Sequence, residues 1–252
     1  MRTLALVAAV LGAAVATPLA AQNVSAIAGT PYNTTSVNAA ANGSSMTGMK
    51  VDVCLSTGCS SHTWGFLSNN LLAGGFYGIQ TADMRIRVGG NLDTYIPLLG
   101  DWRFDLFNTA VLQSVTFSGF GGSTVFDRTA PSPGTPGSDV GRDGDLRNRC
   151  FGFLASGGCV NFDNASVQYR NEVSLNNTVY GDLYESVFID FTNVTLTKSN
   201  AAGGLDESYS EFYLSLDSDN AQLVKVPEPT SFALVLSGLV ALGAAVRRRN
   251  RA

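Results

Sequence analysis

Short runs in which apolar and polar residues alternate recur along the middle of the chain. Residues 84–88 read Met-Arg-Ile-Arg-Val, and residues 102–106 read Trp-Arg-Phe-Asp-Leu. Because successive side chains of a β-strand point to opposite faces, such alternation is typical of strands buried on one side. Further runs of alternating, β-branched or aromatic residues cover 115–117, 187–196, 212–216 and 223–226. The chain is therefore expected to be rich in β-strands.

The segments between these runs favour one class of fold. They are clusters of glycine, asparagine, serine and aspartate, which are the residues that tight turns require. No amphipathic helical stretch of convincing length occurs between residues 22 and 226, and this length suits one all-β domain. Short strands with frequent turns predict a β-sandwich or a jelly-roll-like domain over residues 22–226.

One long segment interrupts this pattern. Residues 129–149 contain three prolines, four glycines and almost no apolar residue, so we expect a surface loop. Asp139, Asp143 and Asp145 lie within it, beside glycines. Carboxylate oxygens on a glycine-rich loop are typical calcium ligands, so a calcium site is one hypothesis for these three residues. The alternative is a solvated acidic loop that binds no metal.

The four cysteines constrain the domain further. An even number of cysteines in an exported protein most often indicates disulfides. Three pairings are possible, and we expect the local one, Cys54 with Cys59 and Cys150 with Cys159, because glycines in both segments let the chain turn back. A four-thiolate zinc site is the alternative. The C-x4-C and C-x8-C spacings differ from the tight pairs of zinc knuckles.

Few residues are candidates for catalysis. His62 is the only histidine in the chain, which excludes any site with two histidine ligands, and a Ser-His-Asp triad requires it. The sequence has no G-x-S-x-G nucleophile elbow. Two carboxylates can hydrolyse glycosides, but 20 acidic residues do not single out a pair. Trp64 and Trp102 either stack on sugar rings or pack in the core. We therefore predict that the protein is not an enzyme.

The N-terminal residues are organised like a signal peptide. One arginine precedes the apolar run Leu4–Val15, and Pro18 ends the run before the small residues Ala20 and Ala21. We predict a helical signal peptide over residues 1–21, cleaved after Ala21 or, alternatively, after Ala20. An anchor that is never cleaved is the other interpretation, although the run is shorter than the ~20 residues of a spanning helix.

The C-terminal residues are organised like a membrane anchor. Residues 232–246 are apolar except for Ser237, and residues 247–252 include four arginines. An apolar run of this length is at the short limit of transmembrane helices, and a basic cluster stays on the cytoplasmic side. We expect a single transmembrane helix at 232–246, a cytoplasmic basic tip at 247–252, and residues 22–226 outside the cell membrane.

A short motif stands just before this apolar run. Pro227, Glu228 and Pro229 are followed by the apolar segment and by the arginine cluster. This order resembles the PEP-CTERM sorting signal of Gram-negative bacteria. The resemblance implies a sorting tail over residues 227–252, whose Pro-Glu-Pro motif is recognised by an exosortase, a membrane-embedded processing enzyme, in a host that makes exopolysaccharide. An ordinary anchor preceded by a proline-containing linker is the alternative.

The net charge of the predicted exported domain argues against two classes of partner. Residues 22–226 carry 11 basic and 19 acidic residues, a net charge of −8. A domain this acidic is not expected to bind nucleic acid or anionic lipid headgroups.

These features together predict an exported structural or surface protein of the cell envelope, outer surface or exopolysaccharide matrix, with its tail first held in the inner membrane. An exosortase-like enzyme and exopolysaccharide are the expected partners. No cofactor is expected, apart from the calcium of the hypothesis above. Two alternatives remain open, which are a carbohydrate-binding module, with or without a dependence on calcium, and a secreted hydrolase.

Overall fold

The structure of the chain is a computed structural model. It describes residues 23–226 except 30, 39–40, 68–75, 90–101, 108–110, 130–133, 139, 149–161, 163, 193 and 195–209. Within these residues the secondary structure consists of strands and turns without a helix, so the prediction of an all-β fold is confirmed. The signal helix predicted for 1–21 and the apolar helix predicted for 232–246 lie outside the described residues. In the described part of the chain, no helix is long and apolar enough to cross a membrane.

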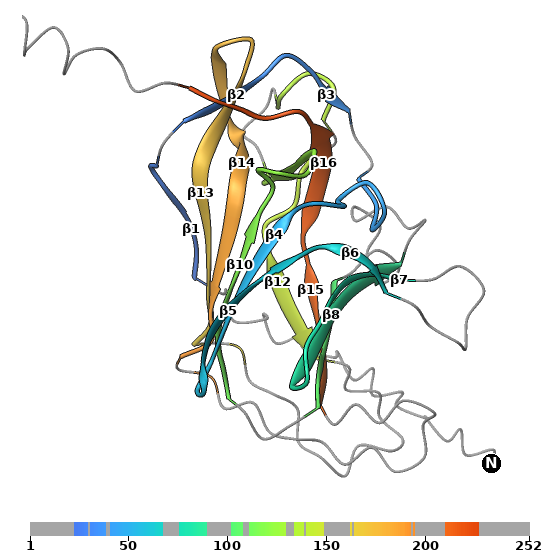
Figure 1. The fold of residues 1–252 in the computed structure, drawn as a ribbon. Coiled ribbons are helices and arrows are strands. Elements are labelled where there is room, and N and C mark those ends of the chain that lie inside the picture. Colours follow the sequence, from blue (N-terminus) through green and yellow to red (C-terminus); the bar gives the residue numbers. More distant parts are fainter. Residues whose placement is uncertain are drawn as a thin grey trace, which may run out of the picture.

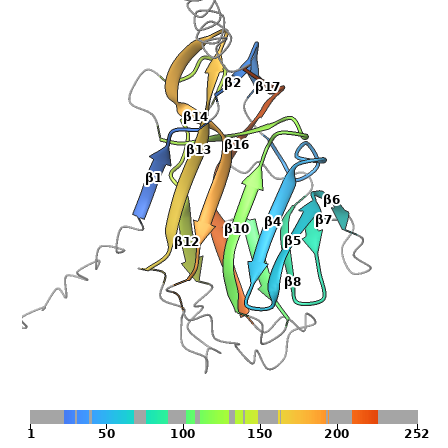
Figure 2. The ribbon, with the colours of Figure 1, turned by 60° about the vertical axis from the view of Figure 1, so that its left-hand side comes forward.

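The strands form two sheets (Figures 1 and 2). Among the described residues, the larger sheet has eleven strands, which follow the order β17-β2-β13-β14-β10-β4-β5 with four more strands attached off this path. These strands are β1 (Asn23–Ile27), β2 (Tyr32–Thr34), β3 (Val37–Asn38), β4 (Lys50–Leu55), β5 (Gly58–Thr63), β10 (Leu112–Ser118), β11 (Thr124–Asp127), β13 (Ser166–Leu175), β14 (Thr178–Asp190), β16 (Asp217–Ala221) and β17 (Val224–Lys225).

The smaller sheet has six strands in the described residues, in the order β12-β15-β9-β8-β7-β6. They are β6 (Gly65–Leu67), β7 (Phe76–Gln80), β8 (Met84–Gly89), β9 (Trp102–Leu106), β12 (Asp145–Asn148) and β15 (Ser210–Ser215). All the pairings within this sheet are antiparallel. In Figure 1 its strands β7 and β8 lie at the lower right, with β5, β10 and β13 of the larger sheet to their left.

One core joins the two sheets. Trp102 and Phe104 of β9 contact Phe117 of β10 in the larger sheet, with ring centroids 4.7 and 6.3 Å apart. Phe212 of β15 stacks on Phe104 at 4.6 Å. All four side chains are buried. The two sheets therefore face each other across a shared aromatic core, which is the layered arrangement that an all-β domain uses to cover its apolar faces.

The alternating runs occupy strands as predicted, with one difference in length. Residues 84–88 lie in β8, residues 102–106 form β9, and residues 115–117 lie in β10. The run 187–196, in contrast, does not continue as one strand. Strand β14 starts earlier than predicted and ends at Asp190, whose side chain accepts a hydrogen bond from the backbone amide of Thr192 at 2.8 Å. Such a local side-chain bond competes with the sheet ladder and ends the strand.

The polar face of β8 and β9 differs from the solvent-exposed face that simple alternation predicts. Asp105 is fully buried, and it accepts hydrogen bonds from Arg85 at 2.8 Å and from Arg103 at 2.8 Å. Arg87 lies 3.2 Å from the same carboxylate and is itself 3 % exposed. A buried charge is tolerated when it is paired and hydrogen-bonded. The arginines of the alternating runs therefore compensate a buried carboxylate on the outer side of the small sheet.

Strand β14 changes its partner halfway along its length. Val187 is paired with Phe117 of β10, whereas Tyr184 is paired with Phe126 of β11. Glu185 stands between these two pairings, and we call this position the fork. The larger sheet curls here, so that one end of it covers the main core and the other end covers a second, smaller cluster.

The carboxylate of Glu185 holds the fork together. It is 2 % exposed. Its Oε1 accepts hydrogen bonds from the Ser118 hydroxyl and, at 3.4 Å, from the Phe120 amide, and its Oε2 accepts one from Asn171 Nδ2 at 2.7 Å. Asn171 has a φ of 60°, at an irregular point of β13. Asparagine tolerates this left-handed conformation better than most residues. Glu185 of β14 thus ties β10 and β13 together at the fork.

Candidate functional site

The C-terminal end of the domain is held by strand β17. Val224 is paired with Asn33, and Lys225 with Tyr32, in an antiparallel pairing with β2 at the edge of the larger sheet. The Val226 amide then donates a hydrogen bond to the carbonyl of Pro31 at 3.1 Å. We call β17, Val226 and their partners Pro31–Asn33 the C-terminal junction. In Figure 2, β17 lies beside β2 at one end of the sheet.

Strand β2 is anchored more firmly than β17. It pairs in parallel with β13, and the Ser174 hydroxyl donates to the Tyr32 carbonyl at 3.2 Å. The side-chain oxygen of Asn33 lies 3.0 Å from the Ser174 hydroxyl and accepts a hydrogen bond from the Asn177 amide at 2.9 Å. Asn176 and Asn177, both with positive φ, form the two-residue turn that joins β13 to β14. Positive φ at both central residues is typical of hairpin turns.

A second apolar cluster supports this end of the sheet. It is formed by Tyr32, Val37, Val125, Val173, Leu175, Leu183, Ala221 and Leu223. Leu223 is 9 % exposed, whereas Val224, the next residue, is 61 % exposed. The last apolar anchor of the folded domain is therefore Leu223, and β17 beyond it is held mainly by backbone hydrogen bonds.

The proline- and glycine-rich segment is not only a surface loop, which corrects the expectation from its composition. Thr135 is 4 % exposed, and both its amide and its hydroxyl donate to Asp182 of β14, at 2.6 and 2.5 Å. The Ser138 hydroxyl donates to Asp127 of β11 at 2.7 Å. Buried carboxylates that accept such bonds satisfy both partners. Asp182, which is distant in the sequence, and Asp127, which lies just before the segment, thus fix its described part against the larger sheet.

The structure describes two of the three aspartates of the calcium hypothesis, Asp143 and Asp145. Asp143 accepts a hydrogen bond from Arg128 Nε at 2.8 Å, so a guanidinium already compensates its charge. Asp145 is the first residue of β12 and is paired with Ser215. Asp139 lies outside the described residues. Among the residues that the structure describes, no group of three or more histidine, cysteine or acidic side chains is placed to hold a metal ion.

A buried tyrosine lies next to this segment. The hydroxyl of Tyr169, in β13, donates to the Arg142 carbonyl at 3.0 Å, and its side chain is fully buried. Burial, and secondarily the charge of Asp143, raise the pKa of Tyr169 above its ordinary value of 10. Burial is also the main cause that raises the pKa of Tyr32 and of Tyr184. The folded domain therefore keeps these phenols protonated more strongly than the unfolded chain does.

This difference predicts a loss of stability in alkaline solution. Above pH 10 the unfolded chain loses the Tyr169 proton while the folded domain retains it, so each further pH unit lowers the free energy of unfolding by about 1.4 kcal/mol for this residue. Tyr169→Phe should cost about 1 kcal/mol at pH 8, through the lost hydrogen bond, and should show a shallower decline between pH 10 and 11. Urea unfolding at pH 8, 10 and 11 measures both slopes, and equal slopes would contradict the assignment.

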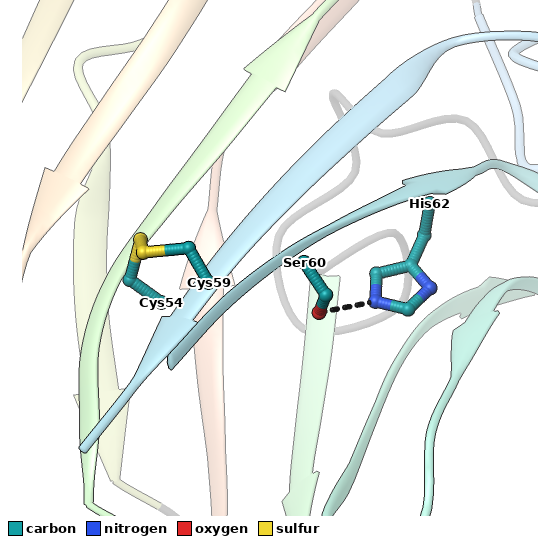
Figure 3. Close-up of a disulfide and its surroundings, with 4 residues drawn as sticks. All are labelled: Cys54, Cys59, Ser60 and His62. Carbon is teal, nitrogen blue, oxygen red and sulfur yellow. Dashed lines mark hydrogen bonds between the residues drawn. A yellow bond between two sulfur atoms is a disulfide. The ribbon is translucent and has the colours of Figure 1, made fainter. Parts of the chain in front are cut away.

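Cys54 and Cys59 form a disulfide between directly paired residues of β4 and β5 (Figure 3). This agrees with the local pairing expected for these two residues. Their Cα atoms are 4.0 Å apart, and a tight turn closes the hairpin between them. Cys150 and Cys159 lie outside the described residues. The disulfide fits a domain that folds in an oxidising compartment.

His62 is hydrogen-bonded to a serine on the same strand. Ser60 Oγ lies 2.8 Å from His62 Nε2, on the face of β5 opposite to the disulfide (Figure 3). Strand β5 is the edge of the larger sheet, and Ser60 is exposed. A nucleophilic serine also needs a group that orients the histidine and donors for the oxyanion. The Ser60–His62 pair supplies a serine and a histidine on an exposed edge strand, where water has free access.

The two tryptophans belong to the core and not to a sugar-binding face. Trp64 and Trp102 are both 0 % exposed, and their ring centroids are 5.0 Å apart. Trp64 Nε1 donates to the Gly43 carbonyl at 2.9 Å, and Trp102 Nε1 donates to the Leu216 carbonyl at 3.2 Å. Their polar atoms are thus satisfied inside the domain. Phe66 and Phe120, at 61 % and 45 %, are large exposed aromatic side chains of the described region.

Comparison with known proteins adds one finding, and it concerns the C-terminal tail. Residues 225–249 match the PEP-CTERM protein-sorting motif. No curated protein and no solved structure matches the chain. The resemblance noted for the tail is therefore confirmed, and the motif marks an exported protein that an exosortase-like enzyme sorts to the cell envelope or surface. The matched residues begin at Lys225, inside β17, so the sorting motif overlaps the C-terminal junction.

Proposed function

We propose that this chain is a non-enzymatic structural protein whose folded β domain, residues 22–226, is delivered by an exosortase-like enzyme to the outer surface or to the exopolysaccharide matrix. The observation that carries this proposal is a sorting motif that directly follows a folded, disulfide-containing domain. The motif directs the sorting of the protein, and the folded domain is the part that is delivered.

The described side chains that looked most capable of chemistry support a structural role. Asp143 is held by Arg128, and Asp145 is paired with Ser215 at the start of β12. Trp102 is enclosed between the two sheets. Each of these groups contributes to folding through contacts inside the domain, which is what a structural protein requires of its polar and aromatic residues.

The mass of the mature protein from its native host tests the route. We expect an N-terminus near Gln22 and a C-terminus within residues 227–231, because the signal peptide and the sorting tail are both removed. A variant with Pro227→Ala and Pro229→Ala is the matched control and should keep residues 232–252. A mature protein that keeps these residues without any substitution would contradict sorting by processing and leave a plain membrane anchor.

Fractionation of the mature protein tests the destination. We expect it to sediment with exopolysaccharide from the same cells, in EDTA as well as in calcium, because Asp143 already has a cationic partner. Release by EDTA alone would favour the calcium-dependent carbohydrate-binding module instead. A calcium site occupied at 100 times its Kd would add about 2.7 kcal/mol of stability, so thermal unfolding with and without calcium gives an independent check. Recovery of the protein free in the medium would contradict a place in the matrix.

A further inference from the structure

We propose that β17 is a release strand, which pairs with β2 in the folded domain and separates from it when the sorting motif enters the processing enzyme. The proposal rests on the proposed route through an exosortase-like enzyme. It adds that the C-terminal junction must open locally before the tail is cut, while the rest of the domain stays folded.

The first argument is the absence of a spacer in the sequence. Val226 is hydrogen-bonded to Pro31, and Pro227, the first residue of the Pro-Glu-Pro motif, follows at once. Five residues, 227–231, separate Val226 from the apolar segment that begins at Phe232. Even fully extended, five residues reach about 18 Å. A headgroup layer is roughly 5–8 Å thick, so the folded domain is tethered close to the membrane surface.

The second argument is how processing enzymes bind a peptide. They commonly hold the residues around the cut bond in an extended conformation, through backbone hydrogen bonds to the enzyme. The family match starts at Lys225, whose backbone position is already paired with Tyr32. One backbone edge cannot pair with β2 and with the enzyme at the same time. An enzyme groove that encloses Lys225 from both sides, and so uses the edge that faces β2, therefore competes with β17 pairing.

The third argument is energetic. Strand β17 has two residues, and both side chains are exposed. The junction is held mainly by a few backbone hydrogen bonds, so it can open locally without global unfolding. Leu223, buried in the second apolar cluster, is where the opening stops. Release of residues 224–226 lengthens the tether from five to eight residues, or from about 18 to about 28 Å.

A disulfide staple across the junction tests the proposal in the full-length chain in its host. Asn33→Cys with Val224→Cys places two cysteines at directly paired positions, of which the second is exposed. We expect the stapled chain to be processed at least tenfold more slowly or not at all, because a covalent link across the junction removes the local opening that the proposal requires. The two single-cysteine variants are the controls. Val224→Cys should be processed at the wild-type rate, and Asn33→Cys, which loses its contacts with Ser174 and Asn177, at the wild-type rate or faster.

A second variant separates a blocked junction from a damaged domain. A flexible Gly/Ser insert of about ten residues between Val226 and Pro227 supplies the missing reach, so it should restore processing of the stapled chain. Processing of the stapled chain at the wild-type rate, or failure of the insert to restore it, would overturn the release strand. Absence of processing in the wild-type chain would instead refute the proposed route itself, so the two failures are distinguishable.

Discussion

Replacing Trp102 by alanine is expected to lower the free energy of unfolding by about 3–5 kcal/mol, the usual range for a buried aromatic residue that leaves a cavity. Trp102 is fully buried and belongs to the smaller sheet, yet its ring lies 4.7 Å from Phe117 and 6.3 Å from Phe126 of the larger sheet. The substitution also leaves the Leu216 carbonyl without its indole donor. The loss therefore combines a cavity between the sheets with a broken buried hydrogen bond.

Two further variants separate these contributions. Trp102→Phe keeps an aromatic ring but removes the donor, and we expect it to cost about half as much as alanine. Phe66→Ala removes an aromatic side chain that is 61 % exposed, and should change stability by about 0.5 kcal/mol or less. Urea titrations that compare midpoints at an unchanged slope give the differences. A loss for Trp102→Ala no larger than for Phe66→Ala would mean that the two sheets do not share this core.

The strands that the sequence predicts are those whose face toward the core is apolar at every second position. Met84, Ile86 and Val88 are the clearest case, because all three are buried in β8. Local alternation suffices there, since each side chain reaches the core whatever strand lies beside it. The local disulfide between Cys54 and Cys59 could be predicted for a similar reason, because a short hairpin brings both residues together without help from distant segments.

Other strands depend on partners that are distant in the sequence. Strand β16 reads Asp-Ser-Asp-Asn-Ala, a polar sequence, yet Asp217 and Asp219 are both 0 % exposed. It is a strand because it pairs with β11 on one side and β3 on the other. These five residues lack the apolar alternation that indicates burial. Their burial depends on the curl of the larger sheet, which places β16 between β11 and β3. Strand β13, with Arg170, Asn171 and Glu172 in its centre, escapes prediction for the same reason.

The polar contacts of the domain show the same limit. Composition predicts that the segment containing Thr135 is solvated. Thr135 is instead buried, and it is hydrogen-bonded to the carboxylate of Asp182, 47 positions further along the chain. The reverse holds at the C-terminal tail. Pro227, Glu228 and Pro229 can be identified from sequence because the processing enzyme reads a linear peptide and not a folded surface. What the sequence does not reveal is that this peptide starts where a paired edge strand ends.

Glu185→Ala is expected to destabilise the domain by about 2–4 kcal/mol, because hydrogen bonds to a charged group contribute about 1.5–3 kcal/mol and their buried donors are left behind. The donors are the Ser118 hydroxyl of β10 and the Asn171 amide of β13. The fork at Glu185 is where β14 changes from one neighbour to the other. The effect is thus expected to include local opening of the turn between β10 and β11 as well as a lower global stability.

Comparing Glu185→Gln with Glu185→Ala separates the loss of the charge from the loss of the whole side chain. Glutamine keeps the shape and one acceptor oxygen, and Asn171 can reverse its own amide to accept from the new NH2 group. We therefore expect the glutamine variant to lose about 1–2 kcal/mol, less than alanine. Glu172→Ala, at a half-buried glutamate of the neighbouring strand β13, is the control for a change in charge and should cost less than either.

Hydrogen exchange locates the effect. The Gly119 amide donates to the Glu185 carbonyl at 2.9 Å, and the Phe120 amide lies near its carboxylate, so both should lose protection in Glu185→Ala beyond the loss seen across the domain. A uniform decrease would indicate that Glu185 contributes only to global stability. If these two amides keep their wild-type protection, Glu185 does not stabilise the fork. A local loss means that one carboxylate determines where the large sheet divides, and so supports the small cluster on which β2 and the C-terminal junction rest.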